Sequence, residues 1–364
     1  MMRMQHTVRS LVCGLLLVLA PMALAVERVS LYETERIIAQ SAGESRQVEV
    51  VADALDEVLR RVSGLAQLPE HEALDAARER PIDLLSRFSL GDSDETIPDA
   101  IGNPQPTYRL ELIFESSLIH QILGAAEIPV WTERRPRSLI VLAAPDGQRI
   151  DLQPENSQVD AVTHLRDHAR LSGLPLSWPL LDLEDTMLVS TDEVWGGFTE
   201  ELLMLGERYQ ADAILAGYVG LQPDTGNWVG RWHYILGNQR TSSTYFGETQ
   251  QEVVQRGVEL ATRVLSDRYG VLVGSDETHT HTFNVMNLGN METHVAVRRY
   301  LRDVIGTDAV YMDSLNGDRA SYRVTSAADE TQWLDLLALE GRLQLVPTVA
   351  AFGESPRLEF VWRD

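Results

Sequence analysis

The segment DAILAGYVG, residues 212–220, decides the fold of the middle of the chain. Its apolar residues follow one another without alternation, which predicts a strand that is buried on both faces. The segment SLIVLAA, residues 138–144, has the same character, and WVGRWHYIL, residues 228–236, alternates as the next strand of a meander. Amphipathic helices are expected at residues 157–172 and 250–269. This alternation of strands and helices predicts a mixed α/β sandwich.

Two further α/β units flank this central unit, which we place at residues 136–274. The first unit, residues 26–135, combines a helix expected at residues 45–64 with a strand expected at residues 107–115. The stretch at residues 88–106 is acidic and rich in Gly and Pro, so it is predicted to be a loop.

The last unit, residues 279–364, reads as β-α-β-β-α-β, which is the ferredoxin-like order. Its central hairpin is indicated by Asn316-Gly317, a strong turn signal. The predicted fold class is therefore α/β (α+β), with tandem small α/β domains, a mixed-sheet middle domain and a ferredoxin-like C-terminal domain.

The N-terminus has the pattern of a cleavable secretory signal peptide. Two arginines precede the apolar run LVCGLLLVLAPMALA, residues 11–25, which ends in Ala-Leu-Ala. We expect cleavage after Ala25 and a periplasmic location. The run is short and is interrupted by Pro21, which disfavours a stable membrane span. The only cysteine, Cys13, lies in this segment, so the mature chain is expected to be free of cysteine.

The charge balance excludes several classes of function. The formal net charge is −23, which disfavours nucleic acid as a partner. All 31 basic residues are Arg. The chain therefore lacks the Lys that a P-loop, a Schiff-base enzyme or a Ser-x-x-Lys acyl enzyme requires.

The stretch WPLLDLEDTMLVSTDEVWGGF, residues 178–198, holds five carboxylates. If the strand expected at residues 177–183 continues, Asp182 and Glu184 share one face and Asp185 follows at its end. Open α/β sheets bind ligands at such strand ends, and carboxylate pairs serve glycoside hydrolysis or bind hard cations. We favour an acidic turn that shapes the fold or an interaction surface over a catalytic site.

The second half of this stretch predicts a helix start. Ser190 and Glu193 form a capping-box pattern that opens one helix running through Leu205. The tryptophan of the EVWGGF segment, Trp195, is a candidate binding residue together with the carboxylates before it.

Other clusters give weaker signals. Arg134 and Arg135 could clamp a phosphate or carboxylate, although an interdomain hinge of ion pairs is favoured. The pairs His164/His168 and His279/His281 lack a closed ligand set, so no metal site is predicted. Trp228 and Trp232 could stack on sugar, although packing in the sheet is commoner. The chain has no G-x-S-x-G elbow and no G-x-G-x-x-G after a strand, so no cofactor is predicted.

Five segments together carry a resemblance to a family: LRRVSG, IPVWTERRP, GLPLSWPLLDLED, EVWGGF and RYQADAILAGYVG. In this order they resemble the exported bacterial family catalogued as domain of unknown function 2066. The resemblance covers most of the chain up to about residue 270. It implies an envelope protein of Gram-negative bacteria, and it implies no activity because that family is uncharacterised.

The sequence therefore predicts a non-enzymatic periplasmic protein that acts by binding an envelope protein partner. One alternative is an envelope hydrolase that uses Asp182, Glu184 and Asp185. Another is a small-ligand binding protein with its pocket between the first two units.

Overall fold

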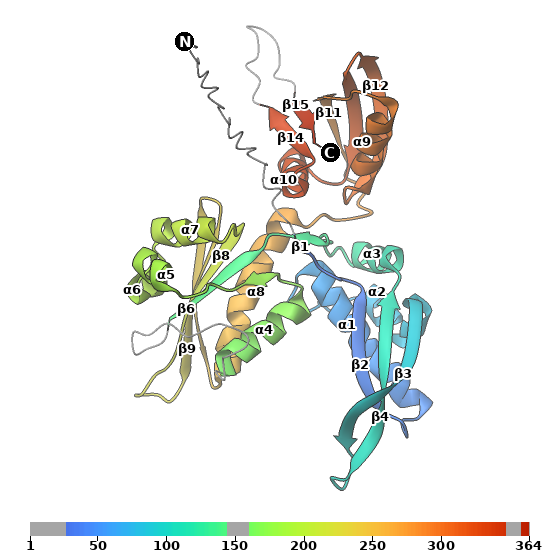
Figure 1. Ribbon diagram of the computed structural model, residues 1–364. Helices are drawn as coiled ribbons and strands as arrows, with labels where there is room; N and C mark the ends of the chain where they lie inside the picture. The colour runs from blue at the N-terminus through green and yellow to red at the C-terminus, as the bar shows by residue number, and fades with distance from the viewer. Residues whose placement is uncertain (1–26, 144–159, 347–357, 364) are drawn as a thin grey trace, which may run out of the picture.

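The computed structural model describes residues 27–143, 160–346 and 358–363. Three α/β units are visible, with the C-terminal unit above the junction of the other two (Figure 1). This arrangement confirms the predicted class of tandem small α/β domains. The expected signal peptide at residues 1–25 and the first residues of the helix expected at 157–172 lie outside the described residues.

The N-terminal unit packs helices on a small antiparallel sheet. The sheet has the order β2-β4-β3, from β2 (Glu33–Ala39), β4 (Pro104–Phe114) and β3 (Leu85–Pro98). Helix α1 (Glu44–Ser63) buries its apolar side against this sheet and ends, as predicted, at Gly64 in the left-handed conformation (φ 72°). Three short helical elements complete the unit: α2 (Glu72–Glu79), η1 (Pro81–Leu84) and α3 (Ser116–Ala125).

The loop predicted at residues 88–106 was wrong, because this stretch forms most of a β3–β4 hairpin that projects as an arm (Figure 1). Its side chains are mostly exposed, including the half-exposed Leu90, so burial imposes no alternating apolar pattern on the sequence. The turn is closed by Asp99, whose carboxylate accepts from the backbone N–H groups of Ile101 (3.0 Å) and Asn103 (2.8 Å).

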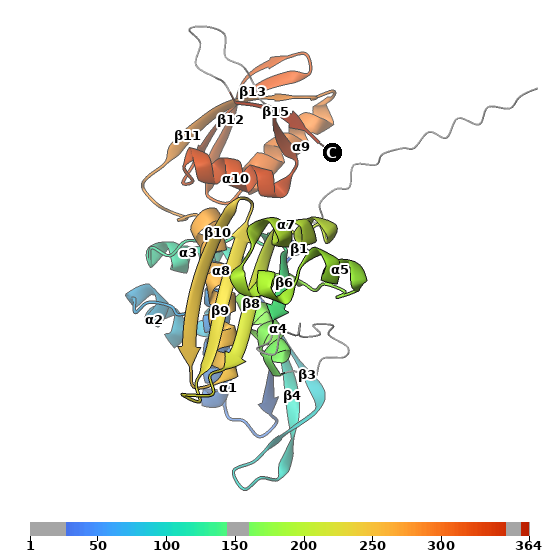
Figure 2. The ribbon, with the colours of Figure 1, turned by 90° about the vertical axis from the view of Figure 1, so that its left-hand side faces the viewer.

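The central unit is a five-stranded sheet in the order β10-β9-β8-β6-β7. Its strands are β6 (Ser138–Ala143), β7 (Leu176–Ser177), β8 (Ala213–Leu221), β9 (Trp228–Leu236) and β10 (Gln239–Gly247). Strand β6 is parallel to β8, and β8 to β10 form the predicted meander. Helices α4 (Asp160–Ser172) and α8 (Gln250–Tyr269) cover one face, and three short helices cover the other (Figure 2).

Two predictions on the second face were wrong. The strand expected at residues 177–183 is paired at Leu176–Ser177 alone, and α5 (Leu183–Leu188) follows. The single helix expected from Ser190 is split into α6 (Thr191–Gly196) and α7 (Thr199–Arg208). The break is at Gly197, which has φ 64° and lies so close to His233 that a Cβ would come within 2.5 Å of its ring.

The C-terminal unit contains the predicted β-α-β-β-α-β order. Its elements are β11 (His279–Met286), α9 (Met291–Asp303), β12 (Thr307–Asn316), β13 (Arg319–Ser326), α10 (Glu330–Glu340), β14 (Leu343–Val346) and β15 (Leu358–Trp362). The sheet order is β12-β13-β11-β15-β14. The last strand, β15, lies between β11 and β14 and is parallel to β11, so one strand is added inside the ferredoxin-like order.

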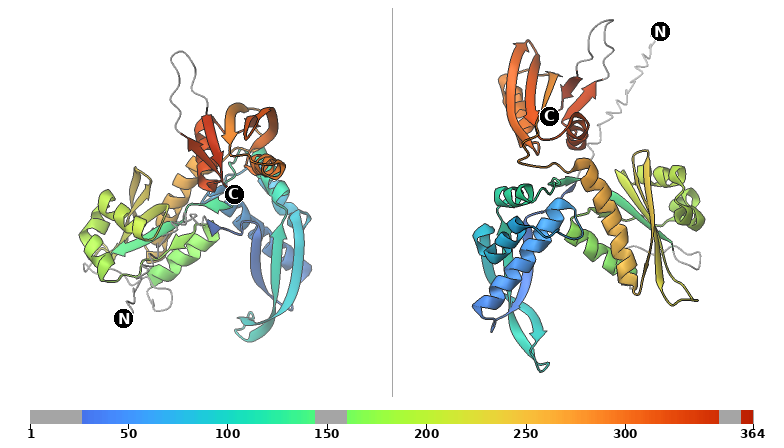
Figure 3. Two further views of the ribbon diagram at one scale, coloured as in Figure 1. Left: turned by 45° about the horizontal axis from the view of Figure 1, so that its top comes forward. Right: turned by 180° about the vertical axis from the view of Figure 1, so that it is seen from behind.

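The C-terminal unit is attached to the end of α8, which runs between the other two units (Figure 3). Arg268 near the end of α8 makes two hydrogen bonds to the Asp335 carboxylate of α10, at 2.8 and 2.9 Å. Gln332 donates to the Gly270 carbonyl just beyond α8 (3.2 Å). These contacts hold α10 against the central unit.

Within the described part of the chain, no helix combines the length and the apolar character that crossing a membrane requires.

Candidate functional site

The predicted carboxylates gather at the start of α5, where they form a hydrogen-bonded turn. Asp182 caps the helix, and its side chain accepts from the Asp185 N–H (3.0 Å). Asp185 is completely buried and accepts from the Leu181 N–H (2.8 Å) and the Tyr209 hydroxyl (2.6 Å). The turn therefore uses Asp185 to satisfy backbone and side-chain donors.

One cation, Arg208 at the end of α7, joins all three carboxylates. Its guanidinium forms ion pairs with Asp182 (2.6 Å), with Glu184 (3.2 Å) and with Asp185. Hydrogen bonding to Arg208 lowers the pKa of Asp182 from its ordinary value. These ion pairs connect α5 to α7. Asp182 and Asp185 are therefore engaged in interactions that stabilise the fold.

Sequence reasoning missed Arg208 and Tyr209. Burial, together with the bond to Asp185, raises the pKa of Tyr209 to about 12, so the hydroxyl stays protonated as a donor. A signal was available, because Arg208 is the one basic residue between positions 180 and 211. Because no other cation lies in this stretch, Arg208 is the nearest partner in the sequence for Asp182, Glu184 and Asp185.

The predicted binding residue Trp195 lies at a corner of the second face. Its side chain is 46% exposed, and its ring meets Tyr218 edge-on at 6.5 Å between centroids. The Arg231 guanidinium carbon lies 4.3 Å from the Trp195 ring centre, a cation–π contact. Beside it the Phe198 ring, 53% exposed, lies over Gly196. The corner therefore presents two aromatic rings and a guanidinium.

Hydrogen bonds from strands β9 and β10 fix the backbone of this corner. The His233 ring donates from Nε2 to the Trp195 carbonyl (3.2 Å) and accepts at Nδ1 from the Ser242 hydroxyl (2.7 Å). Arg240 donates to the Gly197 carbonyl (2.7 Å). The capping box of Ser190 and Glu193 is formed as predicted and fixes the start of α6.

Exposed apolar side chains occur on each of the three short helices and beside their ends. We call this surface the α5–α7 face and define it by Leu180, Leu183, Met187, Trp195, Phe198 and Met204. Leu183 and Met187 are 76% and 80% exposed and share one side of α5 at spacing i,i+4. Residues 180–208 also contain eight Asp and Glu residues and one Arg. The face is thus both apolar and strongly acidic.

Arg135 cannot serve as a ligand clamp, because it is completely buried between two units. Its donors reach carbonyl groups of Arg61 (2.6 Å), Ser172 (2.9 Å) and Gly173 (2.9 Å) among others. Its guanidinium carbon also lies 3.6 Å from the Trp131 ring centre. The alternative prediction of an interdomain role fits this geometry, with carbonyl groups in place of acidic partners.

Arg61 reinforces the same junction from the N-terminal unit. It donates to the carbonyls of Glu33 (2.7 Å) and Leu171 (3.4 Å), and it forms a buried ion pair with Glu57. Together, Arg61 and Arg135 connect α1, α4 and the segment between the units.

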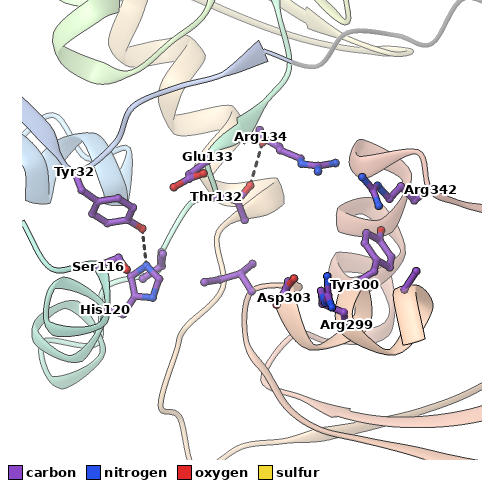
Figure 4. Close-up of a pocket in the computed structure, with 13 residues that line it drawn as sticks. Tyr32, Ser116, His120, Thr132, Glu133, Arg134, Arg299, Tyr300, Asp303 and Arg342 are labelled. Carbon is purple, nitrogen blue, oxygen red and sulfur yellow. Dashed lines mark hydrogen bonds between the residues drawn. The ribbon is translucent and has the colours of Figure 1, made fainter. Parts of the chain in front are cut away.

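Arg134 points elsewhere, into a cleft of about 570 Å³ between the N-terminal and C-terminal units (Figure 4). The alternative prediction of a ligand pocket placed it between the first two units. The observed cleft lies between the first and the last unit. On the N-terminal side the Tyr32 hydroxyl and His120 Nε2 are 2.7 Å apart. Burial lowers the pKa of His120, which keeps its ring neutral near pH 7.

The remaining candidates have structural surroundings. His281 is buried, stacks on Trp333 at 4.8 Å and donates to the Ala328 carbonyl (3.0 Å). Trp232 is buried and donates to the Val253 carbonyl (2.8 Å), and Trp228 packs against the same core, which fits the favoured alternative of packing in the sheet. Among residues 27–143, 160–346 and 358–363, no three acidic, His or Cys side chains gather as a metal site would require.

Comparison with known proteins gives one family match. A model described as a domain of unknown function, DUF8605, matches residues 25–132, which is the N-terminal unit and the start of the segment that follows it. No curated protein matches the chain. The matched model is not domain of unknown function 2066, which the sequence segments resemble. The chain therefore contains an uncharacterised domain of the DUF8605 type at residues 25–132.

Proposed function

We propose that this is an exported, periplasmic envelope protein that acts by binding a protein partner through its α5–α7 face, without catalysis. The observation that carries the proposal is the set of large apolar side chains exposed along this helical layer. Contiguous apolar surface bordered by polar groups is typical of protein interaction sites.

The Trp195 corner has the composition of an interaction hot spot. Trp, Tyr and Arg dominate the binding energy of protein interfaces, and Trp195, Tyr218 and Arg231 lie together here. The bonds from His233 and Arg240 position the corner before any partner arrives. A preorganised surface loses less conformational entropy on binding.

The charge of the face defines the chemistry of the partner. Eight acidic residues and one Arg give residues 180–208 a strongly negative field. A complementary partner would present an amphipathic segment with apolar side chains and Lys or Arg at its border. The binding rate should then fall as salt rises.

The geometry gives less support to the hydrolase alternative. A general acid or base needs a carboxyl group that can reach a substrate. The carboxylate of Asp185 is buried, and both Asp182 and Asp185 are bonded to Arg208. An envelope location is supported by the signal-like N-terminal pattern and by the resemblance to an exported family.

Site-specific photocrosslinking in growing cells tests the proposal. A photoreactive residue would replace Leu183 or Phe198 on the face, and Tyr311, an exposed aromatic residue of the C-terminal unit, as the matched control. We expect one discrete protein adduct from the two face positions and none from position 311. Equal crosslinking from all three positions would contradict the proposal.

A further inference from the structure

The cleft between the N-terminal and C-terminal units is independent of the α5–α7 face. Its volume of about 570 Å³ lies in the range of small-molecule sites, and it is partly open to solvent. Figure 4 shows the residues that line it. The N-terminal unit contributes Tyr32, Ser116 and His120, and the segment after α3 contributes Thr132 and neighbouring residues. The C-terminal unit supplies the opposite wall from α9 and from the residue after Gly341.

Three arginines from different elements converge on this cleft. Arg134 comes from β5 (Arg134–Arg135), Arg299 from α9, and Arg342 from the segment between α10 and β14. The Arg134 side chain extends toward Arg342 in Figure 4, and Arg299 lies below them on the same wall as Arg342. Guanidinium groups from two units therefore face a common space.

The charge balance of the lining is the reverse of the rest of the protein. Acidic residues outnumber basic ones by 54 to 31 in the whole chain. The cleft is lined by three Arg against two acidic residues, Glu133 and Asp303. Neither Arg299 nor Arg342 forms an ion pair with a carboxylate in the part of the chain that the structure describes.

Several guanidinium groups that line one cleft attract an anion more strongly than one such group does alone. Arg is the residue that recognises phosphate and carboxylate with two parallel hydrogen bonds. The geometry therefore favours an anionic occupant over a neutral one.

Neutral donors complete the lining. Burial raises the pKa of Tyr32 and lowers the pKa of His120, so both rings are uncharged near pH 7. Thr132 donates to the Arg134 carbonyl (3.0 Å), which fixes the backbone from which that side chain extends. The Ser116 hydroxyl lies on the same wall as His120. The Ser116 hydroxyl, and the Tyr32 hydroxyl when His120 donates to it, can bond to an oxyanion without adding negative charge.

We propose that this cleft binds a small molecule with at least two oxyanion groups, phosphate or carboxylate, which bridges Arg134 of the segment between the units to Arg299 and Arg342 of the C-terminal unit. Bound in this position, the ligand links the C-terminal unit to the rest of the protein. Its presence should therefore reduce relative motion of the units.

Isothermal titration calorimetry with the full-length mature protein tests this inference. Pyrophosphate and citrate are the probes, and sodium chloride at matched ionic strength is the control for screening. We expect saturable 1:1 binding of at least one probe. The probe with the higher affinity shows whether the cleft prefers phosphate or carboxylate groups.

Variants locate the binding. Arg299→Gln and Arg342→Gln should each weaken the stronger probe about tenfold or more, because each removes a charge-assisted pair. Arg302→Gln is the matched control, since Arg302 is exposed on the same helix outside the cleft, and it should bind like wild type. Circular dichroism would verify that the variants are folded. Lack of saturable binding by both probes, or an equal loss in Arg302→Gln, would overturn the proposal.

Discussion

The Arg135 guanidinium donates to the backbone carbonyl of Arg61 at 2.6 Å, so a side chain between two units closes the end of α1. The same guanidinium reaches the carbonyls of Ser172 and Gly173 at the end of α4. A cation is stabilised at a helix C-terminus, where carbonyl groups carry partial negative charge. Arg135 meets two such termini at once, which explains how it is buried with no acidic partner among the residues that the structure describes.

Replacement of Arg135 by Met should destabilise the protein strongly. The substitution keeps apolar volume but leaves the buried carbonyls of two helix ends without donors, and we expect a loss of about 3 kcal/mol or more. Urea unfolding followed by Trp fluorescence measures this. Arg60→Met is the control, because Arg60 is exposed on α1 and its loss should cost less than about 0.5 kcal/mol. Similar losses in the two variants would contradict the role of Arg135.

Asp185→Asn should lower stability by about 1–3 kcal/mol. The amide still accepts one hydrogen bond, but the buried ion pair with Arg208 is lost. Glu184→Gln is a matched control, because Glu184 is exposed and pairs with the same guanidinium at 3.2 Å. Its expected cost is below about 0.5 kcal/mol. A folded Asp185→Asn protein with wild-type stability would show that the turn does not depend on this carboxylate.

Stability should fall as the pH is lowered below about 6.5, in part through His233. Burial of the ring is the main cause of its lowered pKa, and the charges of Arg240 and Arg231 lower it further. The unfolded state therefore binds this proton at a higher pH than the folded state does. The stabilisation is complete above the unfolded pKa and is lost as the pH falls toward the folded pKa. Urea unfolding at several pH values should show a flatter dependence for His233→Gln, whereas parallel curves would argue against this assignment.

Export predicts a defined N-terminus. The signal-like pattern ends in Ala-Leu-Ala at residues 23–25, so the mature protein should begin at Val26. N-terminal sequencing of native protein purified from a cell fraction tests this. Recovery of a chain that begins at Met1 or Met2 would refute cleavage after Ala25.

Burial determines how much of the fold can be predicted from the sequence. Strand β8 and helix α8 were predicted nearly to the residue, because one is buried on both faces and the other has a continuous apolar side. The Asn316-Gly317 hairpin was also found, because the turn itself demands those residues. The β3–β4 arm was missed, since exposed strands carry no burial pattern.

The candidate site was predicted in part for a similar reason. The clustering of Asp182, Glu184 and Asp185 follows from their closeness in sequence, whereas their partner Arg208 is brought to them by the packing of α7. The break at Gly197 depends on the ring of His233, which belongs to a strand 36 positions later. The convergence of Arg134 with Arg299 and Arg342 depends on how two units meet. Such relationships are tertiary, so local sequence patterns do not reveal them.

The central claim is that the α5–α7 face binds a protein partner, and the affinity of the crosslinked partner for defined variants tests it most directly. Surface plasmon resonance would compare wild type with the double variant Trp195→Ala/Phe198→Ala, and Tyr311→Ala would serve as the exposed aromatic control. Because truncation of a hot-spot residue costs about 2 kcal/mol or more, we predict at least a tenfold loss of affinity for the double variant and none for Tyr311→Ala. Wild-type affinity in a folded double variant would contradict the account.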